Sequence, residues 1–440
     1  MANPFLPLWE YIPDGEPRVF GDRVYLYGSH DRPNSDAFCD YKLKVWSAPI
    51  SDLNNWVCHG DSFHTADDRD HKSDTDWTNK ELYAPDVVEK DGKYYLYAYI
   101  LHSKGCVGIS DKPEGPFKLL STYKYNEDDA GDEGIYNDAG VLVDDDGKVY
   151  IYYGFEHSWM NEINPDNMYE IISGSLIENV IPEDEPYRFF EASSPRKIGD
   201  TYYLIFSPKP PCGQRLAYAT SNSPKGPFTY RGYIVDNGDK YPAGNNHGSI
   251  ACINGQWYIF YHRMTNNTIM SRRACVERIE ILPDGSIPTV EMTSLGFEDA
   301  LNPYKTTPAE IACVLMGGCY ITEKDFFTRP VTNIKKDSII GYKYFEFGED
   351  DSSQTMKFFV KVNGMGCKAK IRILLDDYEN GEEIGCCNID THDGIYSATV
   401  KSVTGRHALY FVVEHCYEGW LVSAFDDKHL FDLIEFSFAK

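Results

Sequence analysis

The sequence predicts an all-β protein in which a five-bladed β-propeller is followed by a β-sandwich. Two observations indicate the propeller: long amphipathic helices are nearly absent, and a short hairpin pattern recurs five times. Radial repetition of small sheets leaves only short, protected edges, which is why repeated hairpins indicate this fold. A third observation indicates a second domain, because the repeat stops near residue 295 while strand-like runs continue. We therefore predict two domains, residues 1–297 and 298–440.

Each repeat has two runs rich in aromatic and β-branched residues around a turn that contains glycine. Asp-Gly, Gly-Asp and Asn-Gly pairs supply the positive φ angles that tight hairpin turns need, and the flanking runs alternate with period two. The five copies are VFGDRVYLYGS from Val19, EKDGKYYLYAY from Glu89, VDDDGKVYIYYG from Val143, KIGDTYYLIFS from Lys197 and INGQWYIFYH from Ile253. Each copy is expected to form the inner hairpin of one blade.

A polar residue opens the strand that leads into each turn. These residues are Asp14, Asp86, Asp138, Glu191 and His247, each six to nine residues before its turn glycine. In a propeller the first strand of every blade lines the central channel, so equivalent strand starts converge at one mouth of that channel. Asp often opens a strand simply because it forms turns, but five matched positions make that explanation weak. We expect four carboxyl groups and one imidazole at one site.

Converging carboxyl groups match the needs of glycoside hydrolysis. One protonated carboxyl assists the leaving oxygen, while an ionised carboxylate activates water or attacks carbon. Crowded like charges raise the pKa of at least one member, so a glutamate can remain a proton donor near neutrality. A third acid can tune that donor.

Several runs resemble glycoside hydrolase family 43. They are LYAPDVVEKDGKYYLYAY, IYNDAGVLVDDDGKVYIYYG, EASSPRKIGDTYYLIFS, NNHGSIACINGQWYIFYHR and SRRACVERIEILPDGSI. The resemblance covers about residues 3 to 295. It implies a five-bladed propeller, an inverting mechanism and action mainly on xylosidic and arabinosidic linkages.

The resemblance also implies roles for the strand-start residues. It makes Asp14 the general base, Glu191 the general acid and Asp138 the residue that holds and tunes the acid. His247 matches an axial histidine that in many members contacts a calcium ion or its water shell. Asp86 lies in an Ala-Pro-Asp strand start and is expected to shape the substrate pocket.

Two runs depart from the commonest family pattern. The first repeat reads EYIPDGEP where many members have Pro-Asp-Pro, and the acid run reads EASSPRK where many have Glu-Gly-Pro. The backbone around the base and the neighbouring subsite can therefore differ. Arg273 is a candidate contact to the sugar or the acid, with a surface salt bridge as the alternative.

An acidic loop, TADDRDHKSDTDW from Thr65 to Trp77, interrupts the region between the first two repeats. Such charge runs are usually solvated. The alternatives are that it rims the pocket, where Trp77 would bind substrate, or that it holds a cation.

The C-terminal region keeps short alternating strands, which need a second sheet to cover them, so a β-sandwich is predicted. The runs KIRILLDDYENGEEIGCCNI, GRHALYFVVE and LFDLIEFSFAK resemble the jelly-roll of carbohydrate-binding module family 6. Trp420 could stack on a sugar ring or pack against the propeller, and a structural role is favoured.

Charge and composition exclude other classes. Lys and Arg number 42 against 68 Asp and Glu, a net charge of −26, which argues against a nucleic-acid partner. The chain lacks an apolar run long enough to cross a bilayer and a signal pattern at its start, so we expect a cytoplasmic protein without a membrane partner. Its twelve cysteines contain no CxxC pair and are expected to be free thiols. The oligomeric state is left open.

Taken together, these features predict an inverting, exo-acting α-L-arabinofuranosidase that acts on arabinoxylan-derived or arabinan-derived oligosaccharides. A β-xylosidase is the main alternative, and the appended sandwich favours the arabinosidase. An endo-arabinanase is disfavoured because the long first-blade loop suggests a closed pocket, and a retaining fructosidase because its Asn-Asp-Pro-Asn-Gly motif is missing. A non-catalytic sugar-binding propeller would not need three matched acids. The expected cofactor is a calcium ion on the propeller axis near His247, with no organic cofactor.

Overall fold

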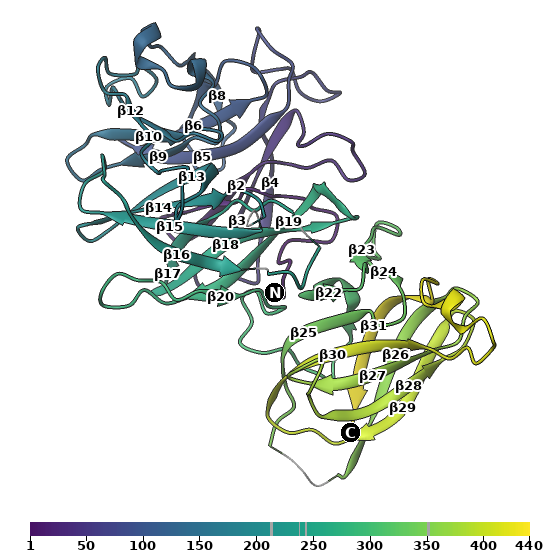
Figure 1. Ribbon diagram of the computed structural model, residues 1–440. Helices are drawn as coiled ribbons and strands as arrows, with labels where there is room; N and C mark the ends of the chain where they lie inside the picture. Colours follow the sequence, from purple (N-terminus) through teal and green to yellow (C-terminus); the bar gives the residue numbers. More distant parts are fainter. Residues whose placement is uncertain (212–213, 237, 243, 350–352) are drawn as a thin grey trace.

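The structure, a computed structural model, describes residues 1–211, 214–236, 238–242, 244–349 and 353–440 (Figure 1). Its regular structure is almost entirely strand, so the all-β prediction is confirmed. Across these residues the strands form seven sheets, five within residues 16–291 and two within residues 307–439. The cysteines in these ranges are all free. None of the helices described there has the length and apolar character of a membrane span.

The five N-terminal sheets follow one another along the chain, and their strands run up and down in sequence order. Their strands are β1 (Glu16–Phe20), β2 (Arg23–Gly28), β3 (Lys42–Pro49) and β4 (Val57–His64); β5 (Leu82–Lys90), β6 (Lys93–Ile100), β7 (Cys106–Ser110) and β8 (Lys118–Thr122); β9 (Gly140–Val143), β10 (Val149–Tyr153), β11 (Trp159–Ile163) and β12 (Ile177–Glu178); β13 (Phe189–Ile198), β14 (Thr201–Pro208), β15 (Arg215–Ser221) and β16 (Thr229–Asp236), joined by β20 (Val290–Glu291); and β17 (Ser249–Ile253), β18 (Gln256–Thr265) and β19 (Thr268–Ile279).

All five predicted hairpins are present, and each joins the first two strands of one sheet. The turn glycines have positive φ angles, from 58° at Gly199 to 82° at Gly147. A side chain would be strained in that conformation, which explains why every copy of the repeat carries glycine at its turn.

The first strands of the five sheets contact one another in a ring. Strand β1 contacts β5 and β17, and β9 contacts β5 and β13. The remaining pair, β13 and β17, is joined by a hydrogen bond of 2.6 Å between Ser194 Oγ and Ser249 Oγ. Strand starts from different sheets are thereby brought close together.

Buried charges tie these inner strands to one another. Arg18 on β1 donates hydrogen bonds of 3.0 and 2.6 Å to Asp86 on β5, and one of 3.0 Å to a backbone carbonyl on β9. Arg196 on β13 donates a 2.6 Å bond to Glu16 on β1 and a 3.0 Å bond to a carbonyl on β17. We call these four residues the axial ion network. It pairs one guanidinium with each carboxylate, the arrangement that offsets the desolvation of buried charges.

The two C-terminal sheets occupy the green to yellow part of Figure 1. One contains β22 (Val314–Met316), β25 (Ile339–Glu346), β30 (Arg406–His415), β27 (Ala369–Leu375) and β28 (Glu383–Ile389). The other contains β23 (Tyr320–Ile321), β24 (Val331–Ile334), β31 (Phe431–Ala439), β26 (Thr355–Gly364) and β29 (Gly394–Lys401), with β21 (Thr307–Pro308) paired to β31. Rings from the two sheets meet, because Phe411 lies 5.5 Å from Phe358 and 4.8 Å from Phe436 between centroids.

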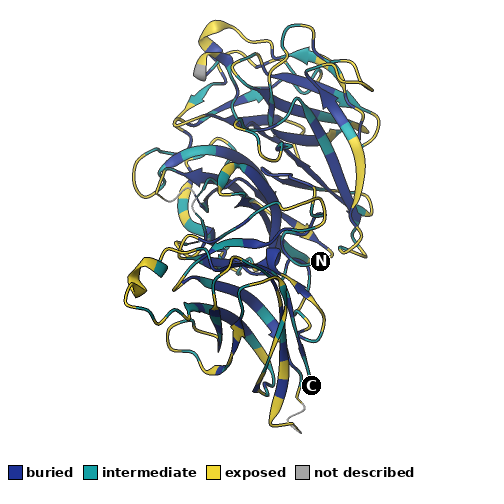
Figure 2. Cartoon of the chain, turned by 90° about the vertical axis from the view of Figure 1, so that its right-hand side faces the viewer, coloured by how far each residue is buried: buried dark blue, intermediate teal, exposed yellow. Residues whose placement is uncertain are grey.

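A single hydrophobic cluster extends from the fourth and fifth sheets into the C-terminal sheets, including Tyr203, Ile250 and Phe438. Figure 2 shows buried strands in both regions and exposed loops around them. The predicted domain boundary at residues 297 and 298 falls between β20 and β21. The C-terminal region is therefore packed against the wall of the ring and is more than an appended tail.

Candidate active site

A cavity of about 550 Å³ lies where the inner strands begin. Its lining includes Asp14, Asp138, Glu191 and His247, so the structure brings together four of the five predicted strand-start residues. We call the three carboxylic acids among them the acid trio. Much of the remaining wall is aromatic, namely Phe38, Tyr83, Tyr99, Phe155 and Phe190. A largely apolar wall with a few convergent polar groups is typical of a small-molecule site of this size.

Asp14 is held in place by two charged or polar donors. Ser29 Oγ donates a 2.6 Å hydrogen bond to its Oδ2, and Arg272 Nη1 donates a 2.9 Å bond to its Oδ1. Its φ angle is 56°, an unfavourable value for a residue with a side chain, and such strain is common at functional sites. Burial opposes ionisation, but Arg272 together with the two nearby histidines and the Ser29 hydrogen bond outweighs it and lowers the pKa of Asp14 below its ordinary value. Asp14 is therefore an ionised carboxylate.

Glu191 and Asp138 behave in the opposite way. Burial, followed by the negative charge of Asp14, raises the pKa of Glu191 to about 7. Burial also raises the pKa of Asp138 to about 7, with Glu191 and Asp14 adding to the effect and His247 opposing it. Because the two carboxyls interact, they titrate as a pair and hold a proton near neutrality. The cavity thus contains both a base and a proton donor.

Arg272 on β19 is a central residue that the sequence analysis missed. It is buried, and besides its bond to Asp14 it donates bonds of 2.9 Å to both carboxylate oxygens of Asp31. The predicted arginine, Arg273, instead contacts Glu310 of the C-terminal region at 3.2 Å. Neighbouring residues on a strand point to opposite faces, so only one of the two can reach the cavity. Arg272 lines the cavity, whereas Arg273, the residue expected to contact the sugar or the acid, does not and forms a buried ion pair instead.

Asp86 and Trp77 also lie outside the residues that line the cavity. Asp86 belongs to the axial ion network, where Arg18 binds both of its oxygens. Trp77 packs against the hydrophobic cluster between the first and second sheets. In this structure both residues therefore have a packing or ion-pair role, and their predicted contact with substrate stays a prediction.

The surroundings of His247 do not make a protein cage for calcium. Its Nδ1 lies 3.9 Å from Asp14 Oδ1 and 3.8 Å from Asp138 Oδ2. Calcium takes six to eight oxygen ligands, whereas Asp14 is already bonded to Ser29 and Arg272. Within the described residues, the one group of three metal-ligating side chains with suitable spacing does not include His247. An axial calcium ion would therefore depend on water ligands, and we assign it no catalytic step.

Comparison with known proteins identifies the family. The family model described as glycosyl hydrolases family 43 matches residues 2–287. The chain belongs to glycosyl hydrolase family 43. A xylosidase/arabinosidase from Thermoclostridium stercorarium is 37% identical, covering 93% of this chain and 95% of its own. A β-xylosidase from Xylanibacter ruminicola is 29% identical, covering 64% of this chain and 97% of its own.

A solved structure shares the fold of the whole chain. It is a family 43 arabinoxylan arabinofuranohydrolase from Bacillus subtilis in complex with cellotetraose. The match covers 100% of this chain and 97% of that one, with a TM-score of 0.54 at 23% identity, so it shows the fold alone. The family model ends at residue 287, and the resemblance of the C-terminal region to carbohydrate-binding module family 6 stays a prediction.

Proposed function

We propose that this family 43 protein is an inverting, exo-acting α-L-arabinofuranosidase that releases arabinose from oligosaccharides derived from arabinoxylan or arabinan. The observation that carries the proposal is the pairing of an ionised Asp14 with a proton-holding Glu191 in one cavity. Glycosidases need this combination of a base and an acid on two sides of the scissile bond. A β-xylosidase remains the second candidate.

In the proposed mechanism Asp14 accepts a proton from a water molecule as the water oxygen bonds to the anomeric carbon. Ser29 and Arg272 hold the Asp14 carboxylate in a fixed orientation for that step. Glu191 gives its proton to the glycosidic oxygen as the bond from that oxygen to the anomeric carbon breaks. Attack from the side opposite the leaving group inverts the configuration. Asp138 transfers no proton to substrate and keeps the pKa of the pair high.

We further infer that the five N-terminal sheets are the blades of a β-propeller and that the two C-terminal sheets form a sandwich. The ring of contacts between first strands supports the propeller. The ring contacts between Phe358, Phe411 and Phe436 support the sandwich. The proposed domains are residues 1–297 and 298–440.

The choice between an α-L-arabinofuranosidase and a β-xylosidase rests on how much of this chain each relative matches. The relative named for both activities matches 93% of this chain, whereas the β-xylosidase matches 64%. The C-terminal region is therefore not part of what this chain shares with that β-xylosidase. An appended sandwich suits an enzyme that removes side branches from a polymer, which favours the arabinosidase.

The deciding experiment compares kcat/KM on an aryl α-L-arabinofuranoside and an aryl β-D-xyloside, and follows the first-formed anomer by NMR. We expect the arabinoside to be preferred by about tenfold or more, the discrimination that 1–3 kcal/mol of pocket contacts can provide. Preference for the xyloside would select the second candidate, and a retained anomer would refute inversion. No turnover of either would favour a sugar-binding protein. Asp14→Asn serves as the inactive control, and the exposed Asp22→Asn as its matched active control.

A further inference from the structure

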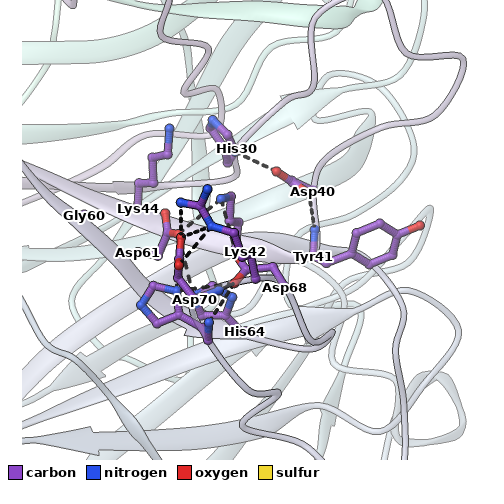
Figure 3. A network of polar contacts seen from close by, with 12 residues as sticks. His30, Asp40, Tyr41, Lys42, Lys44, Gly60, Asp61, His64, Asp68 and Asp70 are labelled. Carbon is purple, nitrogen blue, oxygen red and sulfur yellow. Dashed lines mark hydrogen bonds and ion pairs between the residues drawn. The ribbon is translucent and has the colours of Figure 1, made fainter.

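A second cluster of chemically active side chains lies away from the cavity, at the outer edge of the first sheet. Asp61 and His64 on β4 and His71 in the following loop bring one carboxylate oxygen and two imidazole nitrogens within 4.8 Å of one another. Asp61 Oδ2 is 3.8 Å from His64 Nε2 and 4.0 Å from His71 Nδ1. Figure 3 shows Asp61 and His64 within this polar network. Of the three residues, His71 belongs to the loop from Thr65 to Trp77, for which the sequence left a cation site open.

His64 carries the observation that points to a missing ligand. Its side chain is 5% exposed, and its Nε2 is buried without a hydrogen-bond partner. A buried polar atom without a partner costs free energy, and native structures usually explain it by an ion or a water.

The backbone on both sides of the two histidines is fixed by carboxylates. Asp74 accepts a 2.8 Å hydrogen bond from the His64 N–H, and Asp68 accepts a 2.7 Å bond from the His71 N–H. The two imidazole rings stack with centroids 4.5 Å apart and planes inclined by 24°. A surface cavity of about 280 Å³ adjoins the three donors and gives room for a water ligand. The donors are therefore held together before any ion arrives.

We propose that Asp61, His64 and His71 bind a divalent transition-metal cation, for which zinc is the best fit, with water completing the coordination. Zinc binds imidazole nitrogen and carboxylate oxygen at about 2.0–2.2 Å, which places tetrahedral ligands about 3.3–3.5 Å apart. The two separations from Asp61 need a contraction of about 0.3–0.7 Å to reach that value, and the two imidazole nitrogens lie within 4.8 Å of each other. Calcium and magnesium prefer oxygen donors, and two of the three donors here are nitrogens.

Lys42 is the group that the metal displaces. Its Nζ lies 3.1 Å from Asp61 Oδ2 and 3.9 Å from Asp68 Oδ2, and all three residues are labelled in Figure 3. Asp68 can take over the ammonium group when the cation binds Asp61. Removing the Lys42 charge should therefore tighten metal binding, whereas removing a ligand should weaken it.

The bound metal fastens the loop between the first and second sheets. That loop runs from Thr65 to Glu81, and its two ends are joined by a 2.5 Å hydrogen bond from Thr65 Oγ1 to the Lys80 carbonyl. It leads directly into β5, whose Tyr83 lines the active-site cavity. The metal would thus stabilise one rim of the cavity without touching the acid trio.

The test uses the full-length protein without a polyhistidine tag, treated with chelator, exchanged into metal-free buffer and titrated with zinc chloride by calorimetry. We expect one zinc per chain, a higher Tm with zinc, and weaker binding of calcium chloride. His71→Ala should weaken zinc binding at least about tenfold, as losses around a metal site do. Cobalt chloride should give ligand-field absorption that His71→Ala removes.

Three variants make the outcome decisive. His71 is half-exposed, so its replacement leaves the core intact, and circular dichroism checks this. His157→Ala is the matched control, since His157 is also an exposed histidine paired with a carboxylate, Glu183, at 3.3 Å. Lys42→Met should bind zinc more tightly than the unaltered protein. Failure of the unaltered protein to bind zinc, equal affinity in His71→Ala, or tighter binding of calcium would overturn the proposal.

Discussion

Two groups of buried charges surround the same inner strands, and they differ in charge balance. In the axial ion network two guanidiniums face two carboxylates. In the cavity the acid trio shares one guanidinium, that of Arg272, with the further carboxylate of Asp31. The carboxylates of the axial ion network and of the acid trio come from the first strands or from the residues just before them. Position along the strands therefore does not distinguish the two sets of carboxylates, whereas the ratio of guanidinium to carboxylate groups around each set does.

The balance decides what each group can do. In the axial ion network, burial opposes ionisation, yet Arg196 and Arg18 lower the pKa of Glu16, whereas burial outweighs Arg18 at Asp86 and raises its pKa. In the cavity, burial and neighbouring carboxylates raise the pKa values of Asp138 and Glu191 to about 7. Matched charges form ion pairs that hold strands together, while acids without a matching cation keep a proton that chemistry can use.

Removing the proton donor should give the largest effect. Glu191→Gln should lower kcat by about 10²–10⁴-fold on substrates with poor leaving groups, because only those need full protonation. The loss should be far smaller on activated aryl glycosides. Asp14→Asn should damage both classes alike, since water must be activated whatever leaves. Steady-state kinetics on a series of aryl leaving groups measures the difference.

The control for that series is Asp86→Asn in the axial ion network, which replaces a buried carboxylate that does not line the cavity. It should keep its kcat per folded molecule. Equal losses for Glu191→Gln across all leaving groups would contradict the assignment of the acid.

Breaking the balanced network should instead cost stability. Asp86→Asn leaves Arg18 with reduced compensation, and removing one partner of a buried pair typically costs about 3–5 kcal/mol. Denaturant unfolding measures this loss, and replacing both partners, as in Arg18→Met with Asp86→Leu, should recover part of it. A drop in kcat without a drop in stability would show that Asp86 takes part in the reaction after all.

Much of this contrast could be predicted from the sequence. The repeat placed Asp14, Asp138, Glu191 and His247 at equivalent strand starts, and all four line the cavity. The exception, Asp86, stands six residues before its turn glycine, while the other four stand seven to nine before theirs. That shorter offset puts Asp86 inside β5 and deeper along the axis, where it meets Arg18. The number of residues between Asp86 and its turn glycine therefore distinguishes this residue from the other four already in the sequence.

Other features had no local signal. Arg272 and Arg273 are adjacent and both buried, so the pattern of burial along β19 cannot tell which one faces the cavity. The answer depends on Glu310 of the C-terminal region, which pairs with Arg273 and is 37 residues away in sequence. The sequence marks an acidic loop around His71, but only the fold brings that loop against Asp61 and His64 of β4.

Stability at different pH values separates the two groups again. Folding raises the pKa of Asp138 from about 3.8 to about 7, so the native state binds the proton more tightly than the unfolded chain. Stability from this group is complete below the unfolded pKa and is lost as the pH rises toward 7. The side chain of Asn cannot ionise, so Asp138→Asn does not lose this stability as the pH rises.

The free energy of unfolding of Asp138→Asn, relative to that of the unaltered protein, should therefore rise by about 2–3 kcal/mol between pH 5 and pH 8. Each of the two pH units from 5 up to the pKa of about 7 contributes about 1.4 kcal/mol. Asp86→Asn should be less stable than the unaltered protein at both values. Urea unfolding at the two pH values measures both. A pH-independent difference for Asp138→Asn would mean that Asp138 is ionised throughout.

Calcium addition should give the smallest effect, and it tests the axial ion expected near His247. Because the surrounding carboxylates are already engaged, an ion held mainly by water binds weakly, and at a concentration equal to its Kd it adds only about 0.4 kcal/mol of stability. The measurement is Tm and kcat of chelator-treated protein with and without calcium, made in the His71→Ala background so that the site proposed at Asp61, His64 and His71 does not contribute. A small rise in Tm with kcat unchanged is the expected result, since the protons move between Asp14, Glu191 and substrate. No change in Tm at saturating calcium would contradict the axial ion. A large calcium-dependent change in kcat would instead place that ion among the groups that stabilise the reacting sugar. The net charge of the cavity would then be less negative than its protein residues alone indicate.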